Sequence, residues 1–287
     1  RGRAGMDFAK SSHRKWLTTA AALAESRAQA RAAAGAHAAV LSEKEELLVQ
    51  HLFEMRIHDI TTQLSYPRKV TETAIVYFKR FYTRNSVAAV EPMKLAMTAI
   101  YLALKVEELP KAVDALCNVV LEGGEPVVPP DAVLQCEPLL LQELQFQLVV
   151  FQNFRALEGL ASSMEEQKGV KVPPEVVKRS RLLLARAAYT DAALLFPPAQ
   201  LAAAALHRCA SSKQTPDAVT EKFVEDLSAG EAAVDLLEIV RKQIYPFLQE
   251  GFLFERTAKK DQDVHKAILA RLKDHHRALA SAMDTSE

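Results

Sequence analysis

The residues that could do chemistry do not form a recognisable catalytic or metal-binding motif. The 287 residues contain no nucleophile of the GxSxG type, no HExxH zinc motif and no carboxylate pair in a catalytic setting. The cysteines, Cys117, Cys136 and Cys209, are too far apart for a CxxC-type zinc site, and their odd number favours a reducing compartment. We therefore expect no catalytic residue, no cofactor and no metal ion.

Two clusters of polar side chains have structural interpretations that compete with binding roles. His275 and His276 are adjacent, so on a helix they would point in different directions, which favours solvated surface residues over metal ligands. Lys79, Arg80 and Arg84 lie among aromatic residues at a period near 3.6. This period favours a half-buried helix with solvated charges over a nucleic-acid-binding surface.

The charge balance and the hydropathy exclude further classes of partner. Lys+Arg and Asp+Glu both number 36, so no overall field favours nucleic acid or an anionic membrane. No apolar run reaches the length of a membrane span and no signal peptide is recognisable, so we expect a soluble intracellular protein. Arg1–Gly5 precede Met6, and we exclude them from the prediction of the fold, since leader sequence is one interpretation of them.

The stretch Pro92–Glu108 is the element around which the chain is predicted to fold. From Leu95 to Leu104 only Thr98 is polar apart from one tyrosine hydroxyl, so a helix here would be apolar on every side and buried. Lys105, Glu107 and Glu108 follow within one turn. The pattern predicts a buried central helix that carries a charged tip to the surface.

The elements that must position this helix are predicted to be helical throughout, since glycine is scarce and alanine and leucine are abundant. Ser42 and Glu45 form a capping-box signature for a helix that runs to about Gln63. Asp131 could cap a later helix on which Glu137 and Leu141 share a face. The remaining helices of this first group are predicted after Pro67 and over 112–121, with a loop at 122–130 and the last helix at 132–148.

The same order of elements repeats from Asn153. Placing Pro198 over Pro92 aligns a second alanine-rich helix with the first, so we predict an all-α fold of two tandem five-helix bundles with additional terminal helices. Trp16 precedes the N-terminal helix, where a core contact is favoured over a partner-binding role. The helices of the second group are predicted at 154–164, 174–190, 199–210, 216–227 and 230–245. The terminal helices are predicted at 18–33 and 257–283. The predicted domains are 1–40, 41–150, 151–250 and 251–287.

Several motifs resemble the cyclin family. Tyr77–Val87, YFKRFYTRNSV, followed by Leu102–Glu108, LALKVEE, resembles the cyclin box in the form found in the transcriptional cyclins H and C. Met6–Trp16 is similar to their amino-terminal helix, and Thr190–Leu201, TDAALLFPPAQL, resembles cyclin H, especially its plant and algal forms. The resemblance covers nearly all of Met6–Gln249.

The resemblance implies a non-catalytic subunit that binds and activates a cyclin-dependent kinase. In cyclins, a lysine at the end of the third helix and a glutamate in the fifth bind kinase backbone groups; by motif these are Lys105 and Glu137. The alternative for Lys105 is a helix-terminal cation, and the alternative for Glu137 is a solvated surface residue. The same surface is expected to include Glu108, Leu141, Phe146 and Leu148. Core packing is the alternative for the three apolar residues of this set.

Proline at 138 departs from the family pattern. It would remove a helical hydrogen bond, strain the preceding turn and disfavour the α conformation of Glu137. We therefore expect the fifth helix to be kinked at Pro138 or to begin near it.

The resemblance also implies a nuclear assembly. Cyclin H joins a kinase and a RING-finger assembly factor in the CDK-activating kinase, free and within TFIIH, which phosphorylates CDK activation loops and the RNA polymerase II C-terminal repeat. One alternative is a cyclin C-like subunit of the Mediator kinase module, towards which Ser11–His13 and Pro197–Pro198 lean. Another is a TFIIB-like, nucleic-acid-binding use of the same fold, although this chain lacks the basic face that such binding needs.

Overall fold

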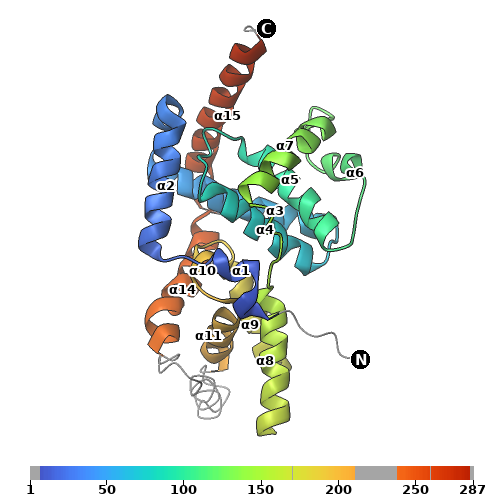
Figure 1. Cartoon of the computed structure of the whole chain (residues 1–287), viewed down its shortest axis with the longest axis vertical. Helices are drawn as coiled ribbons and strands as arrows, with labels where there is room; N and C mark the ends of the chain where they lie inside the picture. The colour runs from blue at the N-terminus through green and yellow to red at the C-terminus, as the bar shows by residue number, and fades with distance from the viewer. Residues whose placement is uncertain (1–6, 170, 211–237, 259, 285–287) are drawn as a thin grey trace. The chain divides into compact units, whose positions relative to one another are not determined.

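The computed structural model describes residues 7–169, 171–210, 238–258 and 260–284, and these residues are predominantly helical (Figure 1). The prediction of an all-α fold is confirmed. The chain divides into two compact units. The first unit comprises Thr18–Leu148 with Thr257–Glu287, and the second comprises Arg1–Leu17 with Val149–Arg256. None of the described helices is both long enough and apolar enough to cross a membrane.

The first unit contains the charged tip and the elements that hold it. Ser42 and Glu45 form the predicted capping box at the start of α3, each side chain bonding the backbone N–H of the other residue. The predicted loop contains a two-stranded antiparallel hairpin. The elements of this unit are α2 (Ala20–Ala34), η2 (Gly35–Val40), α3 (Glu43–Gln63), α4 (Arg68–Tyr82), α5 (Pro92–Val106), α6 (Val113–Cys117), β1 (Leu121–Glu122), β2 (Glu125–Pro126), α7 (Pro130–Glu143) and α15 (Gln262–Asp284).

The helix α5 is the buried centre of the first unit, as predicted. Pro92 occupies its first turn, where the missing N–H costs no helical hydrogen bond. The helix packs against α3, α4 and α7 (Figure 1). Its small side chains allow these neighbours to approach closely, and its buried apolar residues are Leu95, Ala96, Met97, Ala99, Ile100, Leu102, Ala103 and Leu104.

Two basic residues of α4 are buried, so the prediction that they are solvated is wrong. Lys79 Nζ lies 2.7 Å from Glu54 Oε2 on α3, and both side chains are only 2% exposed. Arg80 is also buried and donates from Nη1 to the carbonyl oxygen of Gln147 at 3.2 Å. Buried charges need such partners, because an uncompensated charge in an apolar interior is costly. Only Arg84 of the three is exposed.

The last helix, α15, packs against α3 and η2 of the same unit. Lys273 on α15 lies 2.7 Å from Glu122 on β1, and Arg271 pairs with Glu45. His276 Nε2 lies 2.9 Å from the carbonyl oxygen of Val87. His275 and His276 are therefore half-buried contacts of α15 rather than solvated residues, which corrects the prediction.

The second unit is built around α11, the counterpart of α5. Its buried alanines and leucines pack against α8 and α9. Gly251 faces α9 so closely that an added Cβ would lie 2.3 Å from the carbonyl oxygen of Arg186. The elements described are η1 (Phe8–Lys10), α1 (Ser12–Lys15), α8 (Asn153–Lys168), α9 (Pro174–Ala187), α10 (Ala192–Leu195), α11 (Pro198–Ala210), η3 (Ile239–Ile244) and α14 (Tyr245–Ala258).

The structure describes only part of the second group of helices that the sequence predicts. The predicted helix at 216–227 and the first part of the one at 230–245 lie outside the described residues. Trp16 ends α1 and is partly buried.

Candidate functional site

The charged tip of α5 is shaped by a helix-ending motif with a strained residue. The N–H of Leu109 donates to the carbonyl oxygen of Leu104 at 2.9 Å, and the N–H of Glu108 donates to that of Lys105 at 3.3 Å. This is the Schellman pattern, which normally places glycine at the left-handed position. Here Glu108 occupies it, with φ 59°. The backbone thus stores strain at the tip, a feature that clusters at functional sites.

Two residues of α4 fix this helix end through Glu107. Thr73 Oγ1 donates to Glu107 Oε1 at 2.7 Å. Lys69 Nζ donates to the carbonyl oxygen of Glu107 at 2.6 Å and lies 3.5 Å from its Oε2. Because both the side chain and the backbone of Glu107 are held, the residues on either side of it have a defined position.

The first two predicted site residues are brought together by the structure. Lys105 Nζ donates to Glu137 Oε1 at 2.6 Å, joining the end of α5 to α7. The Lys105 side chain is 44% exposed and that of Glu137 is 12% exposed. Lys105 Nζ also lies 5.2 Å from the centroid of the Tyr101 ring. An ammonium has three donors and a carboxylate about four acceptor positions, so the pair retains capacity for further hydrogen bonds.

Pro138 lies inside α7, which begins at Pro130, so a helix start near Pro138 is excluded. The side chain of Pro138 is exposed, while Val133, Cys136 and Leu140 are buried on the other face. Asp131 lies in the first turn of this helix, and the N-cap position belongs to Pro129. The burial of the apolar face accounts for a helix that continues despite the proline, and it aims Glu137 at Lys105.

The apolar residues of the predicted site lie at the end of α7, which stops at Glu143 rather than 148. The N–H of Phe146 donates to the carbonyl oxygen of Leu141 at 3.0 Å, closing a second Schellman pattern. Gln145 and Phe146 both have positive φ, at 53° and 56°. The Phe146 side chain is 69% exposed, whereas Leu141 and Leu148 are partly buried.

Two buried side chains of α4 hold the segment after α7. The Tyr77 hydroxyl donates to the carbonyl oxygen of Leu148 at 2.6 Å, beside the Arg80 bond to Gln147. Burial raises the pKa of Tyr77, so the hydroxyl remains a donor. Burial lowers the pKa of Arg80 to about 10, which still leaves it charged near neutral pH. The exposed Phe146 is therefore attached to a fixed backbone.

Sequence reasoning missed three exposed apolar residues of α5 and α7. Val106 follows Lys105 directly, and Leu134 and Leu139 lie on α7; each is more than a third exposed. A helical projection of α7 could have found the two leucines, because they fall outside the stripe of Val133, Cys136 and Leu140. Leu134 lies three residues before Glu137 and shares its face of α7, so it adds apolar surface beside the ion pair, whereas Leu139, two residues after Glu137, lies on another face.

The arrangement offers groups that could bind another protein. Among the described residues, no group of three or more His, Cys, Asp or Glu could hold a metal ion. The site offers a preformed ion pair, exposed apolar side chains and a rigid backbone, which are the features of a protein interface.

Comparison with protein families gives two matches that together span most of the chain. The family described as cyclin, N-terminal domain, matches residues 42–149. The family described as cyclin C-terminal domain matches residues 152–274.

Individual relatives include cyclins of two kinds. Cyclin-H1-1 of Arabidopsis thaliana is 33% identical over 172 residues, covering 58% of this chain and 49% of that protein. Cyclin-H of Xenopus laevis is 34% identical over 177 residues, covering 60% and 54%. Cyclin-C of Drosophila melanogaster is 32% identical over 196 residues, covering 64% and 71%. The chain thus spans about half the length of the two cyclin-H relatives.

Solved structures with a similar fold come from kinase complexes. A chain of the CAK complex of Chaetomium thermophilum bound to ATP-gamma-S superposes with a TM-score of 0.76 at 24% identity, covering 93% of this chain and 86% of that one. A chain of the yeast TFIIK (Kin28/Ccl1/Tfb3) complex gives a TM-score of 0.69 at 25% identity, covering 84% and 100%.

Proposed function

This chain belongs to the cyclin family, and on that basis we propose that it is a cyclin H-like regulatory subunit that binds and activates a cyclin-dependent kinase. The relatives named cyclin-H and the similarity to a chain of the yeast TFIIK complex support this proposal. The observation that carries it is the Lys105–Glu137 ion pair on a surface with exposed apolar side chains.

The proposed mechanism is a shift of the kinase towards its active arrangement. A kinase needs its Lys–Glu ion pair and its metal-binding Asp in place, and the position of one regulatory helix controls both. A cyclin binds the active arrangement of the kinase, in which this helix is pressed inward, more tightly than the inactive one. The difference between the two affinities sets how far the population of the active arrangement rises. The chain itself would supply no catalytic group.

The geometry supports specific roles for the predicted residues. Lys105 would donate its remaining N–H groups to carbonyl oxygens of the kinase, and Glu137 would accept from backbone N–H groups, because each already holds the other in position. Glu108 would place its carboxylate beside them, while Phe146 with Leu141 and Leu148 would supply apolar contact. Lys69 and Thr73 are positioning residues for this surface.

The proposed setting is a nuclear transcription assembly. Following the cyclin H resemblance, the partners are a kinase of the CDK-activating type, a RING-finger assembly factor and TFIIH, with no direct contact to nucleic acid or membrane. The substrates of the complex would be CDK activation loops and the RNA polymerase II C-terminal repeat.

A second candidate is a cyclin C-like subunit of a Mediator kinase module, favoured by the coverage of 71% of the Drosophila cyclin-C. Affinity purification of the tagged chain from its own cells separates the two candidates, with the Lys105→Ala and Glu137→Ala double variant as the matched control. We expect a CDK-activating kinase and a RING-finger protein to co-purify with the wild-type chain and to be depleted with the variant. Recovery of Mediator subunits instead would favour the second candidate, and recovery of no kinase would refute both.

A further inference from the structure

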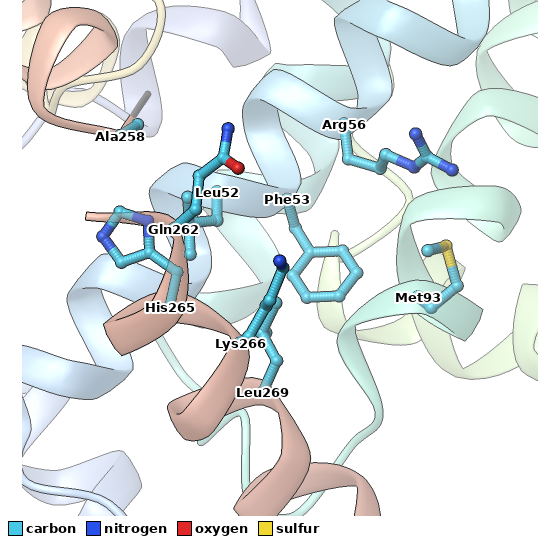
Figure 2. A pocket seen from close by; sticks show the side chains of 9 residues that line it. All are labelled: Leu52, Phe53, Arg56, Met93, Ala258, Gln262, His265, Lys266 and Leu269. Carbon is cyan, nitrogen blue, oxygen red and sulfur yellow. The ribbon is translucent and has the colours of Figure 1, made fainter. Parts of the chain in front are cut away.

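A cavity of about 310 Å³ lies within the first unit, between α3, the start of α5 and α15 (Figure 2). Its walls are mostly apolar and include Leu52 and Phe53 from α3, Met93 from α5 and Leu269 from α15. Sites for small organic ligands typically begin at about 300 Å³, so this volume suits one compact ligand. None of these residues belongs to the surface proposed for kinase binding.

Two cationic side chains line the same cavity from different helices. Arg56 comes from α3 and Lys266 from α15, and Figure 2 shows them on either side of the Phe53 ring. Among the described residues that line the cavity, none is acidic. Asp263 lies 3.9 Å from Lys266, but both side chains are largely exposed, so this pair is weak. The cavity therefore combines an apolar interior with an excess of positive charge.

We propose that this cavity binds a small amphiphilic anion, such as a medium-chain or aryl carboxylate. The apolar body would lie against Phe53, Met93 and Leu269, where it is removed from water. The anionic group would lie at the rim of the cavity, where the exposed side chains of Arg56 and Lys266 each add a modest charge–charge attraction. This ligand site goes beyond the proposed kinase-activating function and does not depend on it.

The test uses two dyes that differ by one sulfonate group, titrated into the full chain. Anilinonaphthalene sulfonate carries the anionic group and fluoresces more strongly in apolar surroundings, and phenyl naphthylamine has the same apolar body without it. We expect one saturable sulfonate-dye site per chain and weaker binding of the neutral dye. Equal affinity for the two dyes would overturn the role of charge.

Variants assign the binding to this cavity. Arg56→Gln together with Lys266→Gln should weaken sulfonate-dye binding by about two- to thirtyfold, the combined effect of two exposed charge contacts, and leave the neutral dye unaffected. Lys111→Gln removes an exposed lysine outside the cavity and should change neither affinity. Leu269→Trp, or Met93→Trp if the first variant has an altered circular dichroism spectrum, should fill the cavity and abolish both signals.

The remaining outcomes also decide the proposal. Decanoate, an aliphatic carboxylate, should displace the sulfonate dye from the wild-type chain; no displacement would overturn the ligand class. Dye binding that survives the tryptophan variants would overturn the location. Sedimentation equilibrium that shows a dimer, together with no dye binding at the same protein concentration, would overturn the proposal in favour of a second copy covering the cavity.

Discussion

Removing the Lys105–Glu137 ion pair separates its contribution to the fold from its proposed contribution to kinase binding. The perturbations are Lys105→Ala, Glu137→Ala and the double variant. Because the Lys105 side chain is 44% exposed, solvent screens the pair. Exposed pairs contribute about 0.2–1 kcal/mol to the free energy of unfolding. We therefore expect each variant to unfold cooperatively with a nearly unchanged urea midpoint.

The expected effect on kinase affinity is much larger. A bound kinase would exclude water from both side chains, and truncating one member of a buried, hydrogen-bonded charge pair at an interface costs about 2–5 kcal/mol. This corresponds to an increase in the Kd for the kinase of about 30- to 5,000-fold. The double variant should lose less binding free energy than the two single variants lose together, since each residue holds the other in position.

Calorimetric titration of each variant into the purified kinase measures this loss, with urea unfolding as the companion measurement. Lys111→Ala is the matched control, because it removes an exposed lysine from the same unit without touching the pair. A double variant that binds with the wild-type Kd, while remaining folded, would refute the assignment of these residues.

Other perturbations test the strain, the packing and the buried charges. Glu108→Gly should relieve a left-handed strain of about 1 kcal/mol and raise Tm in a thermal scan while lowering kinase activation; a lower Tm would contradict the strain. Gly251→Ala should lower the urea midpoint, because its Cβ would lie 2.3 Å from a carbonyl oxygen of α9. The expected loss in the free energy of unfolding is about 1–3 kcal/mol, and an unchanged midpoint would contradict the close approach of the two helices. Lys79→Met should lower the free energy of unfolding by about 3–5 kcal/mol, because it removes the cationic partner of the buried Glu54 carboxylate. Adding Glu54→Leu should recover most of this loss; equal destabilisation by the single and the double variant would argue against the pair. Burial lowers the pKa of His276, so its contribution to stability should be complete above its ordinary pKa of 6.5 and lost as the pH falls below it; His276→Asn should remove this part of the pH dependence, and an identical pH profile would contradict the burial.

The sequence predicts the helices whose signals are local. Ser42 and Glu45 are three residues apart, so their capping box could be found without knowledge of the fold. The uninterrupted apolar run of α5 indicates burial on every side, which the structure confirms. These signals are strong because they do not depend on which neighbour covers the helix.

Long-range contacts could not be predicted in the same way. The prediction that Lys79 is solvated was wrong because its partner, Glu54, belongs to another helix, and nothing in the local pattern identifies that partner. His276 likewise meets the Val87 carbonyl oxygen only after α15 returns to the first unit. In both cases the local pattern describes an amphipathic helix but not what covers it.

The candidate site was predictable in its residues but not in its geometry. Lys105 and Glu137 were assigned through the cyclin resemblance, and their direct ion pair depends on the packing of α5 against α7. Of the two outcomes expected at Pro138, a kink or a helix start, the structure excludes the start, because α7 runs through the proline from Pro130 to Glu143. The left-handed Glu108 and Phe146 could not be predicted, since the residue expected at such positions is glycine.

Activation of the co-purified kinase by the chain tests the central claim most directly. The measurement is kcat/KM for phosphorylation of a polymerase-repeat peptide, with and without saturating wild-type chain and with the Lys105→Ala and Glu137→Ala double variant. We expect the wild-type chain to raise kcat/KM and the folded double variant to fail at the same concentration. A kinase that is equally active without the chain would contradict the proposed function.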